Sequence, residues 1–333
     1  MERNVLVDRL KGYACFLVLL GHVIRGIQTG GIDIPPCFES IELFIWSFHV
    51  ALFLFLSGVV YRLTGEWKNY KTKGAFILHK LIGLGIPYIT FSIIYITINS
   101  MVSGVNTRSS IMDILWIWKT PVAQYWYLYA LFFLFCIWTL LSGILKNWQI
   151  TVFALIVGYG VPLLGASLGS FEVVFYSSLA FGMGTIVNFQ NLTQINPWLK
   201  VGIVLMHLAA GAMSIGWGII ASPMMKEFML LLGIYASILL ISVIQRCKPF
   251  AKFLDFMIRY SFQIYLLHTI FTAETRVLLL RLGITQWWIH VPAGIVCGLT
   301  FPVLIAIVAN KIRILKFFFF PTKAFRKDRV VQK

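Results

Sequence analysis

The stretch GYACFLVLLGHVIRGIQ, residues 12–28, decides the fold class of this chain. It is apolar over most of its length, and a membrane-crossing helix needs about 20 mainly apolar residues. Arg9 and Lys11 stand just before it, and Arg25 is the only charged residue within it. Similar stretches recur, and we predict ten membrane spans: residues 12–28, 41–60, 81–101, 125–141, 150–164, 174–187, 201–220, 228–244, 262–282 and 288–310.

The composition agrees with this prediction. Hydrophobic residues make up 59% of the 333 residues, charged residues 12%, and the mean hydropathy is +0.85. A soluble globular domain carries about 25% charged residues, so the composition excludes that class. We therefore predict an all-α polytopic membrane protein.

The distribution of basic residues predicts the orientation. With the N-terminus in the cytoplasm, 22 of the 28 lysines and arginines fall in cytoplasmic segments and six in outer ones. Both termini are then cytoplasmic. The net charge of +16 can be typical of nucleic-acid binding, but here the charges lie in short loops between apolar spans. We therefore expect membrane lipid as the partner of this charge, and no nucleic acid.

The chain divides simply. Residues 1–316 are predicted to form one ten-span membrane domain, and residues 317–333, FFFFPTKAFRKDRVVQK, a basic cytoplasmic tail anchored at the membrane surface. The alternative for residues 1–30, a secretory signal peptide, lacks a clear Ala-x-Ala cleavage site. The five cysteines stand apart, which favours neither a disulfide framework nor a metal site.

Polar groups inside the spans are costly and therefore candidate functional residues. By helix rise, His22 lies about 16 Å from the cytoplasmic surface, His49 about 20 Å, and His268 slightly below His22. Ser57 lies two turns closer to the cytoplasm than His49. A neutral imidazole suits a general base that takes a proton from a hydroxyl. The alternative is a histidine that only bonds across helices.

The mouths of the spans are basic. Asp8, Arg9 and Lys11 precede the first span, and Lys80 precedes the third. Such a cluster can bind a polyphosphate such as coenzyme A. The alternative reading is ordinary positive-inside topology, with Asp8 orienting Arg9 or Lys11 through a salt bridge.

Five stretches together resemble the integral-membrane acyltransferase family 3. They are DRLKGYACFLVLLGHV (8–23), FHVALFLFLSGVVY (48–61), HKLIGLGIPYITF (79–91), YWYLYALF (125–132) and SFQIYLLH (261–268). The resemblance implies a ten-span protein of the bacterial inner membrane. Such a protein moves an acyl group, usually acetyl, from cytoplasmic acyl-CoA to a hydroxyl of a surface glycan or lipid-linked sugar. It also implies that His22 is the catalytic histidine.

Two positions depart from the family pattern. Lys11 stands where the family has Arg, and lysine keeps the charge but lacks the bidentate fork. Gly83 stands where the family often has Arg, one turn after Lys80. We expect both changes to affect the binding of the coenzyme and not the role of His22 as base.

Two mechanisms follow from the resemblance. Either His22 acts as general base while the hydroxyl attacks the thioester, or His22 takes the acyl group itself and passes it on. His49 and Ser57 are expected to stabilise the oxyanion or orient the base. Arg9, Lys11 and Lys80 would hold acetyl-CoA, with no metal.

The acceptor site is predicted from aromatic residues. Tyr125, Trp126, Tyr127 and His268 are candidates for contacting the sugar, although an interfacial aromatic belt is the simpler explanation of the first three. Two other functions remain open: a glycolipid or solute transporter, and an acyl carrier that serves a separate enzyme.

Overall fold

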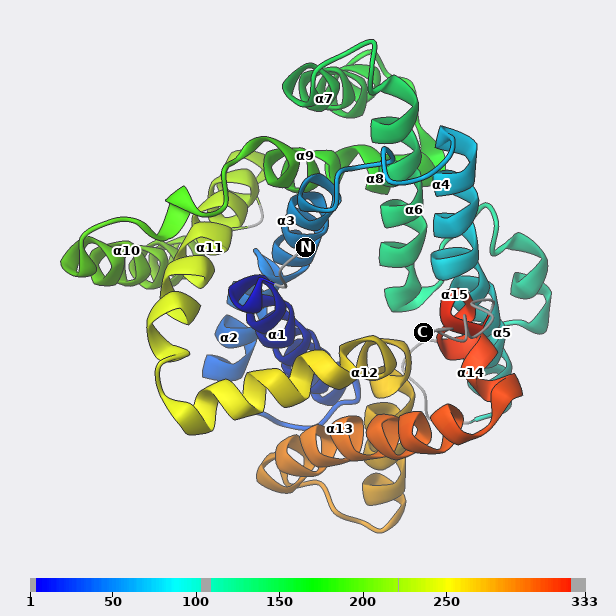
Figure 1. Cartoon of the computed structure of the whole chain (residues 1–333). Coiled ribbons are helices and arrows are strands. Elements are labelled where there is room, and N and C mark those ends of the chain that lie inside the picture. The colour runs from blue at the N-terminus through cyan, green and yellow to red at the C-terminus, as the bar shows by residue number, and fades with distance from the viewer. Residues whose placement is uncertain (1–3, 103–108, 221, 325–333) are drawn as a thin grey trace, which may run out of the picture. The chain divides into compact units, whose positions relative to one another are not determined.

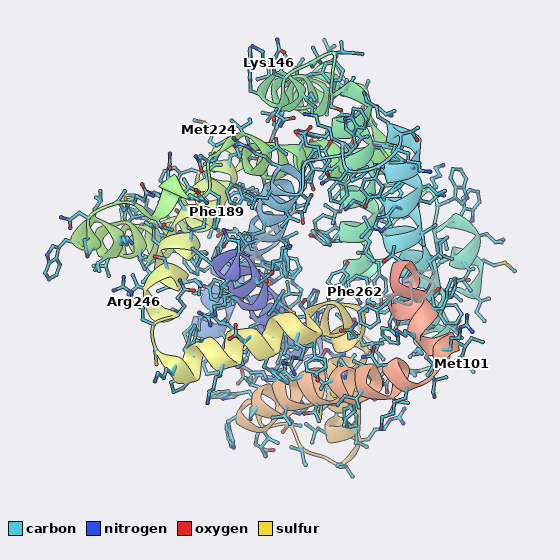
Figure 2. All side chains as sticks on the ribbon, in the orientation of Figure 1. Met101, Lys146, Phe189, Met224, Arg246 and Phe262 are labelled. Carbon is cyan, nitrogen blue, oxygen red and sulfur yellow. The ribbon has the colours of Figure 1, made fainter. Side chains whose placement is uncertain are left out.

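The computed structural model describes residues 4–102, 109–220 and 222–324, and within them the chain is helical with no strand (Figure 1). It has two compact units, which we describe separately. The first contains Met1–Thr64 and Ala180–Thr300, and the second Gly65–Leu179 and Phe301–Lys333. Carbon dominates the side chains of both units (Figure 2).

Among the described residues, seven segments are long and apolar enough to cross a membrane. They are Val5–Thr29, Pro36–Leu63, Lys73–Met101, Ala123–Leu141, Pro197–Gly216, Pro223–Ile244 and Trp287–Lys311. The prediction of an all-helical chain with several membrane spans is confirmed. The three other predicted ranges also fall on helices: α7 (Asn147–Leu163), the pair α8 (Glu172–Tyr176) and α9 (Ser178–Ile186), and α12 (Lys248–Arg281). The count of ten spans stays a prediction.

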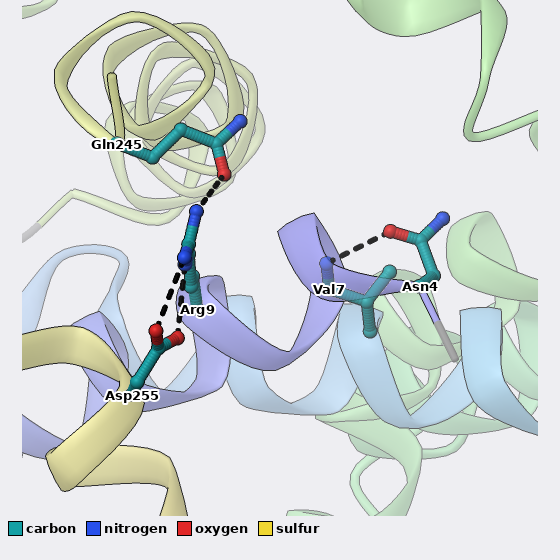
Figure 3. A network of polar contacts seen from close by, with 5 residues as sticks. All are labelled: Asn4, Val7, Arg9, Gln245 and Asp255. Atoms are coloured by element: carbon teal, nitrogen blue, oxygen red, sulfur yellow. Dashed lines mark hydrogen bonds and ion pairs between the residues drawn. The ribbon is translucent and has the colours of Figure 1, made fainter. Parts of the chain in front are cut away.

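Helix α1 (Val5–Thr29) organises the first unit. The side chain of Asn4 caps its start by accepting a hydrogen bond from the Val7 amide at 3.2 Å (Figure 3). The helix packs against α2 (Pro36–Trp46), α3 (His49–Leu63), α11 (Pro223–Ile244) and α12. Because it is covered on several sides, buried residues occur throughout its length.

The contact between α1 and α12 is parallel. Three hydrogen-bonded pairs mark its register, with increasing residue numbers on both helices: Arg9 with Asp255, Cys15 with Ser261, and Gly26 with Arg276. Gly12 permits the close approach, because a Cβ there would lie 2.6 Å from the Leu254 carbonyl oxygen. Two helices that cross a membrane in parallel are separated along the chain by an odd number of crossings.

The second predicted span is not one continuous helix, as the range 41–60 implied. Helix α2 ends at Trp46 and α3 begins at His49, and Phe48 between them has a non-helical φ of −144°. Phe48 is 3% exposed and sits against Gly233 of α11, where a Cβ would overlap its ring. The residue at the break therefore packs against a distant glycine, a contact that local sequence does not indicate.

The remaining helices of the first unit close around this core. Helix α9 packs closely on α3 at two glycines. Gly58 of α3 lies against the Phe181 carbonyl of α9, and Gly184 of α9 lies against the Phe55 carbonyl of α3. Helix α10 (Pro197–Gly216) packs on α2 and α11. The part of α13 (Trp287–Lys311) up to Thr300 places Gly294 and Gly298 against Val23 and Leu19 of α1.

The second unit is built on α6 (Trp126–Leu141), which contacts α4 (Lys73–Lys80), α7 and α8. Between α4 and α5 (Ile86–Met101) lies one π-helical turn, Leu81–Gly85. The short 3₁₀ turns Ile111–Trp116 and Ala123–Tyr125 lead into α6. Trp138 of α6 is fully buried at its centre.

The C-terminal segment is partly folded onto this unit. Helix α14 (Arg313–Phe319) runs through the predicted boundary at residue 316, and α15 (Pro321–Ala324) follows it. Phe319 is 5% exposed, and its ring lies 5.0 Å from that of Phe91 on α5. The beginning of the predicted tail is thus packed on protein, whereas residues 325–333 lie outside the described residues.

Candidate functional site

Four aromatic rings lie together beside the C-terminal half of α1 in the first unit. The ring of His22 lies 5.0 Å from that of His268 on α12 and 5.4 Å from that of Trp46 at the end of α2. Trp46 in turn lies 5.1 Å from His49, the first residue of α3. The break between α2 and α3 matters here, because it puts Trp46 and His49 at adjoining helix ends. We call His22, Trp46, His49 and His268 the ring cluster.

Backbone carbonyls determine the tautomers of two cluster histidines. Nδ1 of His49 lies 2.7 Å from the Ile45 carbonyl oxygen, and Nδ1 of His268 lies 2.8 Å from that of Ile264. A carbonyl oxygen only accepts, so each Nδ1 must carry the proton. In the neutral ring, Nε2 is then the acceptor. Nε2 of His268 is buried and has no hydrogen-bond partner among the described residues.

His22 differs from its two neighbours. It is partly exposed, whereas His49 and His268 are 1% and 0% exposed. Its described contacts are with rings, and no described backbone carbonyl holds it as those of Ile45 and Ile264 hold its neighbours. Of the three imidazoles, His22 is therefore the most exposed.

An ion pair covers the cluster one turn further along α1. Arg25 donates from Nε to Glu42 Oε1 at 2.7 Å, and its guanidinium carbon lies 3.6 Å from the centroid of the Trp46 ring. Glu42 is 5% exposed, whereas the side chain of its partner Arg25 is 45% exposed, so only the carboxylate end of the pair is buried. Sequence reasoning missed Arg25, Glu42 and Trp46 as neighbours of the site. The spacing of Arg25 one turn after His22 was the available indication.

The start of α1 carries a second ion pair (Figure 3). Arg9 donates from Nε and Nη2 to the two carboxylate oxygens of Asp255 at 2.9 and 3.1 Å, and from Nη1 to Gln245 at 3.3 Å. A coenzyme phosphate would have to share Arg9 with this bidentate partner. Lys11 is partly buried, and the carboxylate of Asp8 acts electrostatically on its ammonium group.

Ser57 lies away from the ring cluster. It is about 12 Å of helix rise beyond His49 on α3. Its hydroxyl donates to the Phe53 carbonyl oxygen at 2.8 Å. The predicted role of Ser57 at the oxyanion stays a prediction.

The other predicted site residues belong to the second unit. The ammonium nitrogen of Lys80 lies 4.0 Å from the Phe135 ring centroid and 5.1 Å from that of Phe76. The π-helical turn with Gly83 follows directly, and such turns are frequent at functional sites. Tyr125 is fully buried, whereas Trp126 and Tyr127 are partly exposed and keep a face for contact.

A comparison with known families identifies the family of the chain. A family model described as an acyltransferase domain matches residues 4–307. The chain belongs to acyltransferase family 3. No curated protein and no solved structure matches the chain. The match spans every cluster residue of this family 3 acyltransferase and confirms the resemblance seen in its five sequence stretches.

Proposed function

We propose that this family 3 protein is a membrane-bound O-acyltransferase that moves an acyl group, acetyl in the first instance, from acyl-CoA to a sugar hydroxyl. The acceptor is a cell-surface glycan or a lipid-linked sugar. The observation that carries the proposal is His22, a partly exposed imidazole whose ring lies beside the buried ring of His268 and, through Trp46, near that of His49. Membership of an acyltransferase family supports the reaction class.

His22 has two possible roles in the transfer. As general base, it takes the hydroxyl proton while the hydroxyl oxygen attacks the thioester carbonyl and the coenzyme leaves as its thiolate. As nucleophile, its nitrogen attacks the thioester and the thiolate leaves; a hydroxyl then takes the acyl group, and the hydroxyl proton passes to the freed imidazole nitrogen. The second role lets an acyl group pass from one side of the membrane to the other. His49 and Ser57 remain our candidates for orienting groups near the oxyanion.

Our candidate residues for the coenzyme are Asp8, Arg9 and Lys11 in the first unit, and separately Lys80 in the second. The distance from Lys11 to His22 along α1 is about 16 Å. Extended acyl-CoA, with phosphates at one end and the thioester at the other, is long enough for that distance. The Lys80 ammonium, held on aromatic faces, is already partly desolvated, which favours a phosphate partner.

For the membrane arrangement we propose ten spans with both termini in the cytoplasm of a bacterial inner membrane. The parallel pairing of α1 and α12 supports this count, because it requires an odd number of crossings between them. Seven predicted spans lie between residues 28 and 262. The excess of lysine and arginine in the predicted cytoplasmic segments supports the orientation.

The alternative is a transporter, and one observation favours it. The break between α2 and α3 is a discontinuous membrane helix, which transporters use at substrate sites. Transporters of that type have a matching break in a second repeat, and the sequence has no visible half-to-half similarity. We therefore prefer the acyltransferase.

The test is release of free thiol from acetyl-CoA by detergent-purified protein. We expect slow release that His22→Ala abolishes and that His290→Gln retains. His290 is a matched control: it is a buried histidine of the same unit whose Nε2 contacts the Ile284 carbonyl at 2.9 Å, outside the ring cluster. Release that survives in His22→Ala would remove His22 from the reaction. Absence of both release and acetyl-CoA binding in the wild type would favour the transporter.

A further inference from the structure

We propose that His268 is a positioning residue for His22: its neutral Nε2 accepts the N–H of His22 and aims the opposite nitrogen of His22 at the substrate. The inference rests on the proposed function. It gives His268 a different task from the acceptor contact predicted from the sequence, because the ring is fully buried behind His22.

The two helices hold the rings at the required separation. The ring centroids are 5.0 Å apart with an interplanar angle of 60°. At this centroid separation, a nitrogen of each ring can approach to about 3 Å when the two nitrogens face each other, which is the range of a hydrogen bond. The parallel α1–α12 contact, fixed by Arg9–Asp255 before the pair and by Arg276–Gly26 after it, keeps the rings at the same level.

The backbone determines which partner in the pair donates. Nδ1 of His268 points at two carbonyl oxygens, those of Ile264 at 2.8 Å and Tyr265 at 3.0 Å, so it carries the proton. Nε2 of His268 is then an acceptor, and it is buried without a partner among the described residues. Burial of an unpaired acceptor is costly, and an N–H from His22 would relieve that cost. The bond makes the far nitrogen of His22 the basic one.

This arrangement replaces the carboxylate that orients a catalytic histidine in many hydrolases. There, a buried aspartate accepts from one imidazole nitrogen while the other meets the nucleophile. The nearest described carboxylate on α2, Glu42, is already paired with Arg25. A neutral acceptor places no net charge in the membrane interior, where an isolated charge is expensive. When His22 takes a proton, the bond to His268 becomes charge-assisted and stronger.

His49 does not fit the same task. Its Nδ1 is also held by a carbonyl, but the Trp46 ring contacts both it and His22. The direct ring neighbour of His22 on the other side is His268.

The experiment compares His268→Leu, which keeps the bulk but removes the acceptor, with His268→Gln, which keeps an acceptor oxygen. The readouts are kcat and KM for thiol release from acetyl-CoA by the full chain, with His290→Gln as control. We expect kcat of His268→Leu to fall about 100-fold with little change in KM, because misorientation of the base costs about that factor. We expect His268→Gln to recover about tenfold of the loss, since an amide oxygen can accept the same N–H.

A second measurement does not depend on the variants folding. ¹⁵N shifts of histidine-labelled wild-type protein report which nitrogen of His268 is protonated. The inference requires protonated Nδ1, and a protonated Nε2 would overturn it. It is also overturned if His268→Leu keeps the wild-type kcat, whether or not KM for acetyl-CoA changes. Failure of the proposed function looks different, because thiol release is then absent from the wild type.

Discussion

Replacing Gly12 by alanine should impair catalysis, although the added methyl group lies far from the ring cluster. A Cβ at this position would lie 2.6 Å from the Leu254 carbonyl oxygen and 3.3 Å from the Ile258 amide nitrogen on α12. Ordinary carbon–oxygen contact needs roughly 3.2–3.4 Å, so α1 and α12 must separate locally by about 0.6–0.8 Å. Backbone atoms cannot rotate away as a flexible side chain can.

The displacement has two expected costs. Overpacking of a close contact destabilises by about 1–3 kcal/mol. His22 and His268 lie further along the same two helices, and a misplacement near 1 Å at a catalytic pair costs about 100-fold in rate. We therefore expect Gly12→Ala to lower the thermal unfolding midpoint and to lower kcat for thiol release by about 10- to 100-fold.

Gly202→Ala is the matched control. Gly202 lies in α10, and a Cβ there meets nothing within 4 Å. Alanine is a better helix former than glycine by about 0.5–1 kcal/mol, so this variant should be as stable as the wild type or slightly more stable. Detergent-purified proteins are compared by thermal unfolding and by thiol release. Wild-type stability and rate in Gly12→Ala would refute the close packing of α1 on α12.

Three further changes test other contacts of the same unit. Asp255→Asn removes the bidentate partner of Arg9. It should destabilise the protein by no more than about 1 kcal/mol in thermal unfolding, because the Asp255 side chain is 52% exposed. A larger loss would mean that this ion pair stabilises the protein more than an exposed pair does. Arg276→Met removes a buried donor to the Gly26 carbonyl and should cost about 1.5–3 kcal/mol in the same assay, with no cost if the bond is absent. Trp46→Phe keeps the ring but weakens the stack under the guanidinium, and should cost about 0.5–2 kcal/mol; an unchanged midpoint would remove that stack from the stabilising contacts.

The apolar runs predicted the helices well, because a membrane span must satisfy its own backbone hydrogen bonds and helix is the local solution. Each of the ten predicted ranges falls on a helix or on two consecutive helices. The break at Phe48 and the π-helical turn Leu81–Gly85 were not predicted. At the break, Phe48 packs closely on Gly233, a residue of another helix, and local sequence does not indicate that contact.

The sequence predicted how deep the site histidines lie in the membrane, but not which helices are neighbours. Helix rise placed His22, His49 and His268 at similar levels, and the structure brings the three into one cluster through Trp46. Packing between segments distant in sequence determines which helices are neighbours. It also determines that α1 and α12 run parallel. For the same reason the pairing of Arg9 with Asp255 was not predicted, and Arg9 was assigned only to the coenzyme.

The parallel register of α1 and α12 also has a consequence for biosynthesis. Arg9 and Asp255 are 246 residues apart, so at a synthesis rate of about 5–20 residues per second α1 precedes its partner by roughly 10–50 s. During that interval the face with Gly12 and His22 must rest on lipid or on a helper protein. Chains whose synthesis stops before α12 is complete at residue 281 would therefore expose the face of α1 that α12 covers. A membrane quality-control protease could recognise that face.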